Sequence, residues 1–302
     1  MYLYHFGLRE LPFTLTPNTN FYLALEPHNE ALAVLLTALK TGEGFIKVVG
    51  EVGTGKTLMC RKLLNEIPDH FVTAYIPNPY LKPDELRRAV AVELGVKQAQ
   101  RMSLQLLTQR IQQRLLELHN QGHSVVLILD EAQALPAESL EALRLFTNLE
   151  TETRKLLQVV LFAQPELDER LAEQAFRQLK QRITFSYRLR AMNALEVEHY
   201  IQHRLSVAGY KGGNLFNPGV IKKIAKVSQG IPRLVNIICH KMLMLSYGEG
   251  RYQLTKKHLA SAIDDTEGLQ RTVRHWHYLL SFITVVILLG AYVFWRETRG
   301  ML

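Results

Sequence analysis

The chain contains 302 residues, of which 47% are hydrophobic and 21% are charged. These are ordinary values for a folded globular protein, so they exclude disorder over most of the chain and allow one large or two modest domains. The formal net charge of +8 would suit nucleic acid or an anionic membrane, but no Lys/Arg block concentrates it, and alone it decides little.

The N-terminus carries no secretory signal, because residues 1–6 lack a basic start and an apolar run. A lead-in that contains Pro12, Pro17 and Pro27 precedes a helix expected over about residues 29–40. Further along, two cysteines stand far apart without companion ligands, which indicates reduced thiols rather than a disulfide framework or a zinc site.

The next part of the chain predicts alternating strands and helices, which is typical of a parallel sheet with crossover helices. Strands are expected at residues 45–49, 72–76, 124–129, 156–163 and 183–189. Helices are expected from near residue 56 and at residues 83–94, 103–121, 138–149 and 166–180. We therefore predict an α/β fold for this region.

After Arg190 the strand signals stop. Helices separated by Gly or Pro are expected at residues 193–208, 218–228, 232–247 and 255–265. They form a second, all-helical unit, which we call the lid. The expected organisation is a lead-in segment (1–42), an α/β core (43–190), the lid (191–267) and a linker (268–277).

Residues 278–295 contain no Asp, Glu, Lys or Arg. As a helix they would extend about 27 Å at roughly 1.5 Å per residue, close to the ~30 Å of a bilayer core. Trp276 lies at one end and Trp295 at the other, where aromatic rings favour the membrane interface. We expect a transmembrane helix here rather than a buried core helix, with residues 296–302 as a short outer tail.

Residues 50–58 carry the first chemical motif, because the first eight of them match the phosphate-binding pattern G-x-x-x-x-G-K-[ST]. The glycines let backbone N–H groups converge on a phosphate at the positive end of the next helix. Lys56 would supply positive charge to the outer phosphates, and Thr57 would offer its hydroxyl to Mg²⁺. The residues expected to bind ATP are Gly50, Glu51, Val52, Gly53, Thr54, Gly55, Lys56, Thr57 and Leu58.

An apolar run over residues 125–129 leads into the second motif, Asp130-Glu131. The strand would deliver Asp130 to the sheet edge, where it can hold Mg²⁺ directly or through water. Glu131 could then orient and deprotonate the attacking water. Alone this pattern is weak, since strands often end in acidic residues, but it follows a phosphate-binding loop. Together the two motifs predict ATP hydrolysis.

These motifs and the helical second unit resemble the AAA+ ATPases, and among them the bacterial secretion-ATPase family of general secretion pathway protein A (ExeA). The segments that carry the resemblance are residues 6–17 (FGLRELPFTLTP), 130–133 (DEAQ), 164–167 (QPEL), 181–183 (QRI) and 230–233 (GIPR). Ala163 replaces the glycine expected before the QPEL segment. The resemblance covers residues 1 to about 268 and implies a three-layer αβα core with a parallel sheet, followed by a helical lid.

The resemblance also implies roles for single residues. Gln164 would sense the γ-phosphate, and Arg233 would reach the nucleotide from the lid. Arg182 would be the arginine finger offered to a neighbouring subunit's ATP, with Arg177 and Arg188 as close alternatives. The residues expected to border the adenine are Pro12, Phe13 and Tyr22.

Two functions fit these expectations. In the first, the chain is a homo-oligomeric ring ATPase anchored in the bacterial inner membrane, with its ATPase domain in the cytoplasm and with pilus or secretion assembly proteins as partners. Only about seven residues follow Trp295, which resembles the ATPases of MSHA-type (type IV) pilus biogenesis, and an ExeA-like role in type II secretion is the alternative.

The second function is a DNA-linked ATPase of the transposition or initiation type. No Lys/Arg patch interleaved with aromatic residues supports it, so we do not expect a nucleic-acid partner. A scaffold that binds ATP without hydrolysing it is a further alternative. The presence of both Asp130 and Glu131 argues against that scaffold.

Overall fold

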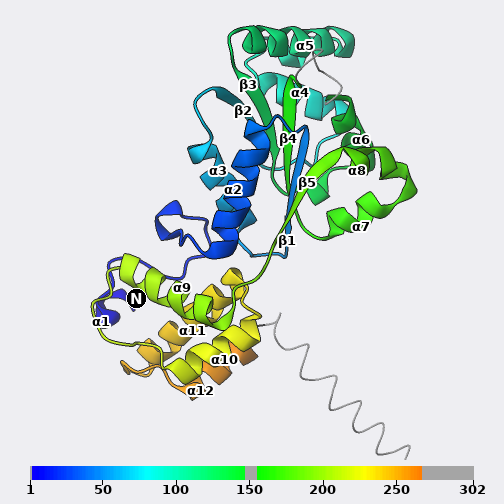
Figure 1. The fold of residues 1–302 in the computed structure, drawn as a ribbon. Helices are drawn as coiled ribbons and strands as arrows, with labels where there is room; N and C mark the ends of the chain where they lie inside the picture. Colours follow the sequence, from blue (N-terminus) through cyan, green and yellow to red (C-terminus); the bar gives the residue numbers. More distant parts are fainter. Residues whose placement is uncertain (1, 147–154, 267–302) are drawn as a thin grey trace, which may run out of the picture.

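The computed structural model describes residues 2–146 and 155–266. Its strands form one parallel sheet in the order β2-β3-β4-β1-β5 (Figure 1). They are β1 (Phe45–Gly50), β2 (Phe71–Ile76), β3 (Ser124–Leu129), β4 (Leu157–Ala163) and β5 (Ile183–Leu189). The predicted strands and the predicted parallel arrangement are therefore confirmed.

Helices cover both faces of this sheet and complete the three layers. One face carries α2 (Glu26–Lys40) and α3 (Lys56–Glu66). The other face carries α4 (Pro83–Glu93), α5 (Leu104–Asn120), α6 (Ala137–Phe146), α7 (Glu166–Ala172) and α8 (Arg177–Arg182). Short 3-10 turns lie at η1 (Thr19–Phe21), η2 (Ala99–Arg101), η3 (Ala132–Ala134) and η4 (Gln174–Phe176).

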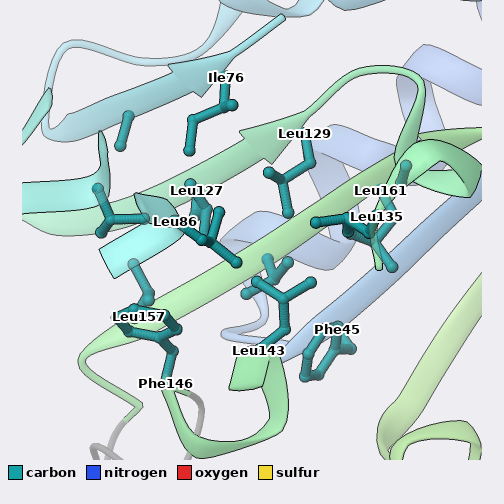
Figure 2. Close-up of a cluster of buried hydrophobic side chains, with 14 of the residues drawn as sticks. Phe45, Ile76, Leu86, Leu127, Leu129, Leu135, Leu143, Phe146, Leu157 and Leu161 are labelled. Atoms are coloured by element: carbon teal, nitrogen blue, oxygen red, sulfur yellow. The ribbon is translucent and has the colours of Figure 1, made fainter. Parts of the chain in front are cut away.

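The central strands are almost continuously apolar because both of their faces are covered. Every residue of β1 and of β4 is buried. Figure 2 shows part of the cluster on one face, where Leu127 of β3 and Leu161 of β4 lie with Leu86 of α4 and Leu143 of α6. Burying each such side chain contributes about 1.5–3 kcal/mol. This packing fixes the strand ends that carry the chemical motifs.

Two helix predictions differ from the structure. The single helix expected over residues 166–180 is wrong, because α7 ends at Ala172 and Glu173 is extended (φ −64°, ψ 148°). Leu171 and Phe176 are both buried but five residues apart, a spacing that one helix face cannot accommodate. Helix α2 begins at Glu26, earlier than expected, since Pro27 occupies its first turn, where proline is tolerated.

The lid consists of α9 (Ala194–Val207), α10 (Pro218–Ser228), α11 (Pro232–Gly248) and α12 (Lys256–Asp264). The start of the chain, including α1 (Leu3–Phe6), packs into the core of this lid. Buried side chains of Tyr2, Phe6 and Phe13 share one cluster with lid residues, and Figure 1 shows the N-terminus beside α9. Residues 2–25 thus contribute to the lid, whereas α2 contributes to the α/β core.

The expected linker, transmembrane helix and outer tail (residues 268–302) lie outside the described residues. Within residues 2–146 and 155–266, no helix combines the length and the apolar character needed to cross a membrane.

Candidate active site

The strand order brings the predicted site residues to one edge of the sheet. Strands β3, β4 and β1 are neighbours and run in the same direction, so their carboxyl ends meet. The phosphate-binding loop follows β1, Asp130 follows β3 and Gln164 follows β4. Ligands of open parallel sheets bind at such carboxyl ends.

The loop over residues 50–57, the P-loop, needs its glycines. Gly53 and Gly55 have φ of 82° and 100°, a region that side chains with a Cβ rarely adopt. Gly55 is the residue before α3, so the loop delivers its backbone to the positive end of that helix. A Cβ on Gly53 would also lie 2.5 Å from the Cβ of Arg233, because the lid approaches the loop closely there.

Lys56 is folded into the P-loop, with only 4% of its surface exposed. Its ammonium group donates to the carbonyl oxygens of Gly50 (2.8 Å) and Glu51 (2.9 Å). Burial lowers the pKa of Lys56, and the carboxylates of Glu131 and Asp130 oppose this shift. A cation held this way is placed to exchange loop carbonyls for phosphate oxygens.

Asp130 and Thr57 form a pair of oxygen ligands. Asp130 is 2% exposed, and its carboxylate accepts hydrogen bonds from the Thr57 side chain and from the backbone N–H of Glu131 (3.0 Å). Burial raises the pKa of Asp130, while these two hydrogen bonds act in the opposite direction. Carboxylate and hydroxyl oxygens next to a phosphate-binding loop suit Mg²⁺, which prefers hard oxygen ligands.

The carboxylate of Glu131 is held by two carboxamides. Its Oε2 accepts from the Nε2 of Gln164 (2.9 Å) and from the Nε2 of Gln133. In turn, the Oε1 of Gln133 accepts from the backbone N–H of Gln164 (3.0 Å). The structure thus brings the predicted base and the predicted sensor into direct contact, and it adds Gln133. Sequence reasoning placed Gln133 in a motif but gave it no role.

The lid closes one side of the site through the start of α11. The backbone N–H of Arg233 donates to the carbonyl oxygen of Gly53 (3.3 Å), so lid and P-loop are in contact. Arg233 also lines a cavity of about 290 Å³ together with Lys56, Glu131 and Gln164. The cavity is therefore shared by the α/β core and the lid.

Other cavity-lining residues were missed by sequence reasoning. They are Thr14, Leu15, Thr16, Pro17 and Asn18 from the N-terminal segment, and Tyr200, Arg204 and Asn236 from the lid. The expected adenine neighbours Pro12, Phe13 and Tyr22 do not line this cavity. Phe13 instead packs edge-on against Phe216 in the lid core, because its apolar ring is buried there. Thr14, Leu15, Thr16 and Pro17 lie within the family signature at residues 6–17, which was the sequence signal for this part of the wall.

The proposed finger Arg182 and its rivals Arg177 and Arg188 do not line the cavity of their own chain. Arg177 begins α8 and Arg182 ends it, and Arg188 lies on the edge strand β5. Arg177 and Arg188 are exposed, whereas Arg182 is half-buried. A role in a neighbouring subunit's site stays a prediction for all three.

Residues 39–171 match the family model of an AAA domain. Over 270 residues the chain is 40% identical to general secretion pathway protein A of Aeromonas hydrophila, covering 89% of this chain and 49% of that protein. The chain thus spans about half the length of this curated relative.

Solved structures with a similar fold include Drosophila ORC bound to DNA, with a TM-score of 0.63, 19% identity, and coverage of 84% of this chain and 64% of that chain. Cdc6p of Pyrobaculum aerophilum gives a TM-score of 0.62 at 16% identity, covering 82% of this chain and 70% of that chain. The RuvB branch migration motor of Thermotoga maritima gives 0.51 at 14% identity, covering 84% and 73%. At these identities the likeness concerns the fold alone.

Proposed function

Since this chain is an AAA-type P-loop NTPase related over most of its length to general secretion pathway protein A, we propose that it hydrolyses ATP to drive assembly of a secretion machine in the bacterial envelope. The observation that carries the enzymatic part is the meeting of three groups at one sheet edge. These are Lys56 in the P-loop, Asp130 with Thr57, and Glu131 with Gln164.

Each group has a defined task in this proposal. The P-loop backbone and Lys56 bind the phosphates, and Thr57 and Asp130 would hold Mg²⁺. When bound, Mg²⁺ neutralises charge on the phosphate oxygens. Glu131 orients the attacking water and accepts its proton, which is worth about 10²–10⁴-fold in rate. Gln164 contacts the γ-phosphate, and Arg233 couples the lid to the nucleotide.

The contact between Gln164 and Glu131 links sensing to chemistry. A carboxamide N–H₂ group has two donors, so Gln164 can contact a γ-phosphate oxygen and still donate to the Oε2 of Glu131. The position of the Glu131 carboxylate then depends on the group that contacts the γ-phosphate.

Assembly into a ring completes the site in this proposal. Arg182 of one subunit stabilises the charge on the phosphates bound by its neighbour, a contribution of about 10³–10⁵-fold in comparable enzymes. The α/β core (43–190) and the lid (191–267) move relative to each other with the nucleotide state. The partners are other subunits and the assembly proteins of the machine.

The envelope location rests on the relation to general secretion pathway protein A and on the uncharged stretch at residues 278–295. We place the ATPase domain in the cytoplasm, because ATP is cytosolic, with a single-pass anchor in the inner membrane. The narrower assignment to MSHA-type pilus biogenesis stays a prediction. Loss of the pilus, or of secretion, in a strain carrying Lys56→Ala distinguishes the two machines.

The test of the enzymatic proposal is ATP turnover by the whole chain at increasing protein concentration. Lys56→Ala should abolish ATP binding, and Glu131→Gln should retain ATP binding while turnover falls about 10²–10⁴-fold. Lys40→Ala, an exposed lysine at the end of α2, is the matched control and should behave as wild type. Wild-type turnover in Glu131→Gln would remove Glu131 from the mechanism, and turnover in Lys56→Ala would refute the site as a whole.

A further inference from the structure

One wall of the cavity is formed by the N-terminal strap, which we define as residues 12–21. Its residues 14–18 line the same cavity as the P-loop. Because the P-loop binds phosphates, the part of the cavity formed by the strap and by lid residues is left for the nucleoside end of ATP. The contacts that hold the strap in place should therefore affect binding of the nucleoside.

Arg204 of α9, in the lid, makes hydrogen bonds and a ring contact with the strap. It is 7% exposed, and its guanidinium donates to the carbonyl oxygen of Pro12 and approaches the carbonyl oxygen of Thr14 (3.5 Å). The same group lies 4.6 Å from the ring centroid of Phe21, at the far end of the strap. One side chain thus contacts three points of the strap.

Arg204 lacks an acidic counterpart in the part of the chain that the structure describes. Its recorded polar contacts are carbonyl and hydroxyl oxygens, including the hydroxyl of Tyr200 (2.9 Å). A buried charge without an acid is costly, so an apolar residue would serve packing better at this position. The planar fork of guanidinium donors explains its presence, since its spread N–H groups reach the carbonyl oxygens of Pro12 and Thr14 and the hydroxyl of Tyr200, and no apolar side chain could do so.

Asn236 of α11 completes a closed set of hydrogen bonds with Arg204, Tyr200 and the carbonyl oxygen of Thr14, which we call the circuit. Its Nδ2 donates to the carbonyl oxygen of Thr14 (3.2 Å), and its Oδ1 accepts from the hydroxyl of Tyr200 (3.1 Å). Tyr200 and Arg204 lie one turn apart on α9, and Asn236 lies one turn after Arg233 on α11. Two lid helices therefore converge on a single strap carbonyl.

The strap is tied to the α/β core as well. Arg61 of α3, the helix that begins in the P-loop, donates from Nη1 to the carbonyl oxygen of Pro17 (3.0 Å). Thr14 is thus fixed to the lid and Pro17 to the core. The residues between them bridge the two units along the wall of the cavity.

The geometry assigns Arg204, Tyr200 and Asn236 as positioning residues that hold strap residues 14–18 against the nucleoside part of ATP and take no part in phosphate binding. This inference rests on the proposed binding of ATP, but not on its hydrolysis or on the envelope role. It predicts that disrupting the circuit weakens binding of the nucleotide as a whole while leaving binding of its phosphates intact.

The test compares ATP with inorganic tripolyphosphate, each titrated with Mg²⁺ into the whole chain by calorimetry. Arg204→Met and Asn236→Ala should each raise the Kd for ATP about tenfold, the effect of roughly 1.4 kcal/mol, as expected for one or two lost hydrogen bonds. The Kd for tripolyphosphate should stay within about twofold of wild type. Arg251→Met is the matched control, because Arg251 is an exposed lid arginine outside the cavity.

Equal weakening of ATP and tripolyphosphate would overturn the inference, because it would indicate general damage to the cleft. An unchanged Kd for ATP in both variants would overturn it too. Amide hydrogen exchange gives a second readout that fold stability does not control. With ATP bound, the amides of residues 14–16 and 18 should be less protected in both variants than in wild type, while β3 and β4 keep wild-type protection. If wild type binds ATP without hydrolysing it, the proposed function fails and the assignment of the circuit stands.

Discussion

At the end of β3 the backbone of Glu131 turns into the left-handed conformation (φ 54°), which costs a residue other than glycine about 1–2 kcal/mol. Such strain is found where the surrounding structure enforces it, commonly at functional sites. Here the enforced turn accompanies the contacts of the Glu131 carboxylate with Gln133 and Gln164. The residue that we propose as the base is therefore oriented by both its backbone and its neighbours.

The charge of Asp130 is needed for the proposed catalysis but lowers the stability of the fold, and this opposition can be tested. Burial raises its pKa above the ordinary value, so its charged form is disfavoured in the fold. We predict that Asp130→Asn abolishes turnover but raises Tm at neutral pH, since the neutral amide can still accept from Thr57 and from the Glu131 N–H. The charged carboxylate therefore lowers the free energy of unfolding by its full amount above the raised pKa of the folded state. This loss of stability becomes smaller as the pH falls toward the pKa of Asp130 in the unfolded chain, about 4.

The measurement is thermal unfolding of wild type and Asp130→Asn between pH 8 and pH 4. The gain in Tm should be largest at high pH and shrink toward low pH. Asp84→Asn, an exposed carboxylate in the first turn of α4, is the control and should show no such trend. A gain that grows as pH falls would contradict the direction of the pKa shift.

Site residues can be recognised from the sequence when their partners lie close to them along the chain. Lys56, Asp130 and Glu131 lie in short motifs whose spacing reflects one turn or one strand end. Gln133 and Arg204 could not be assigned, because their tasks are defined by partners 31 and 192 residues away. Sequence spacing carries no record of such distant contacts.

At the scale of elements, the P-loop and the start of α11 are in direct contact. The Cβ of Arg233 would clash at 2.5 Å with a Cβ on Gly53, and the Arg233 N–H donates to the Gly53 carbonyl. A glycine is needed at this position for its backbone angle and also for the approach of the lid. The lid can therefore respond directly to a change in the loop.

Gly53→Ala separates these two requirements when it is compared with Gly42→Ala. Both glycines have φ of 82°, but nothing lies within 4 Å of a Cβ on Gly42. Gly42→Ala should lose about 1–2 kcal/mol of stability with ATP affinity unchanged. Gly53→Ala should lose more stability and bind ATP at least about tenfold more weakly, since the lid must shift. Equal effects in calorimetry and denaturant unfolding would refute the lid contact.

Among the elements, the strands were predicted best, because β1, β3 and β4 are nearly continuous apolar runs and β5 alternates between apolar and polar residues. The failure at residues 166–180 has a physical origin. The composition there favours a helix throughout, and only the burial of both Leu171 and Phe176 interrupts it. Tertiary packing therefore causes the break between α7 and α8, and the helix propensity of these residues does not predict it.

At the scale of the whole molecule, the sheet edge, the lid and the strap enclose one cavity, and Arg182 lies outside it. If Arg182 acts on a neighbour's nucleotide, an inactive P-loop and an inactive finger can complement each other. We predict that Lys56→Ala and Arg182→Ala are each nearly inactive alone, by at least about 10³-fold for the finger variant. Mixed, they should recover a measurable share of wild-type turnover.

The recovered activity should rise with total protein concentration, as expected for assembly. The same mixture made with Arg177→Ala or with Arg188→Ala in place of Arg182→Ala identifies the finger among the three. Absence of recovery in all three mixtures, with each variant folded by its unfolding curve, would rule out a finger supplied by a neighbour from this group.

The packing of residues 2–25 into the lid has a consequence for biosynthesis. The hydroxyl of Tyr2 meets the ring of His240 (2.9 Å), and Tyr2 and Phe6 share a core with Leu259. During translation the first of these residues emerge from the ribosome long before the last. At about 5–20 residues per second the delay is roughly ten to fifty seconds. Once β5 has emerged the α/β core can fold, while the aromatic start of the chain is still exposed because its partners in α11 and α12 have not been synthesised.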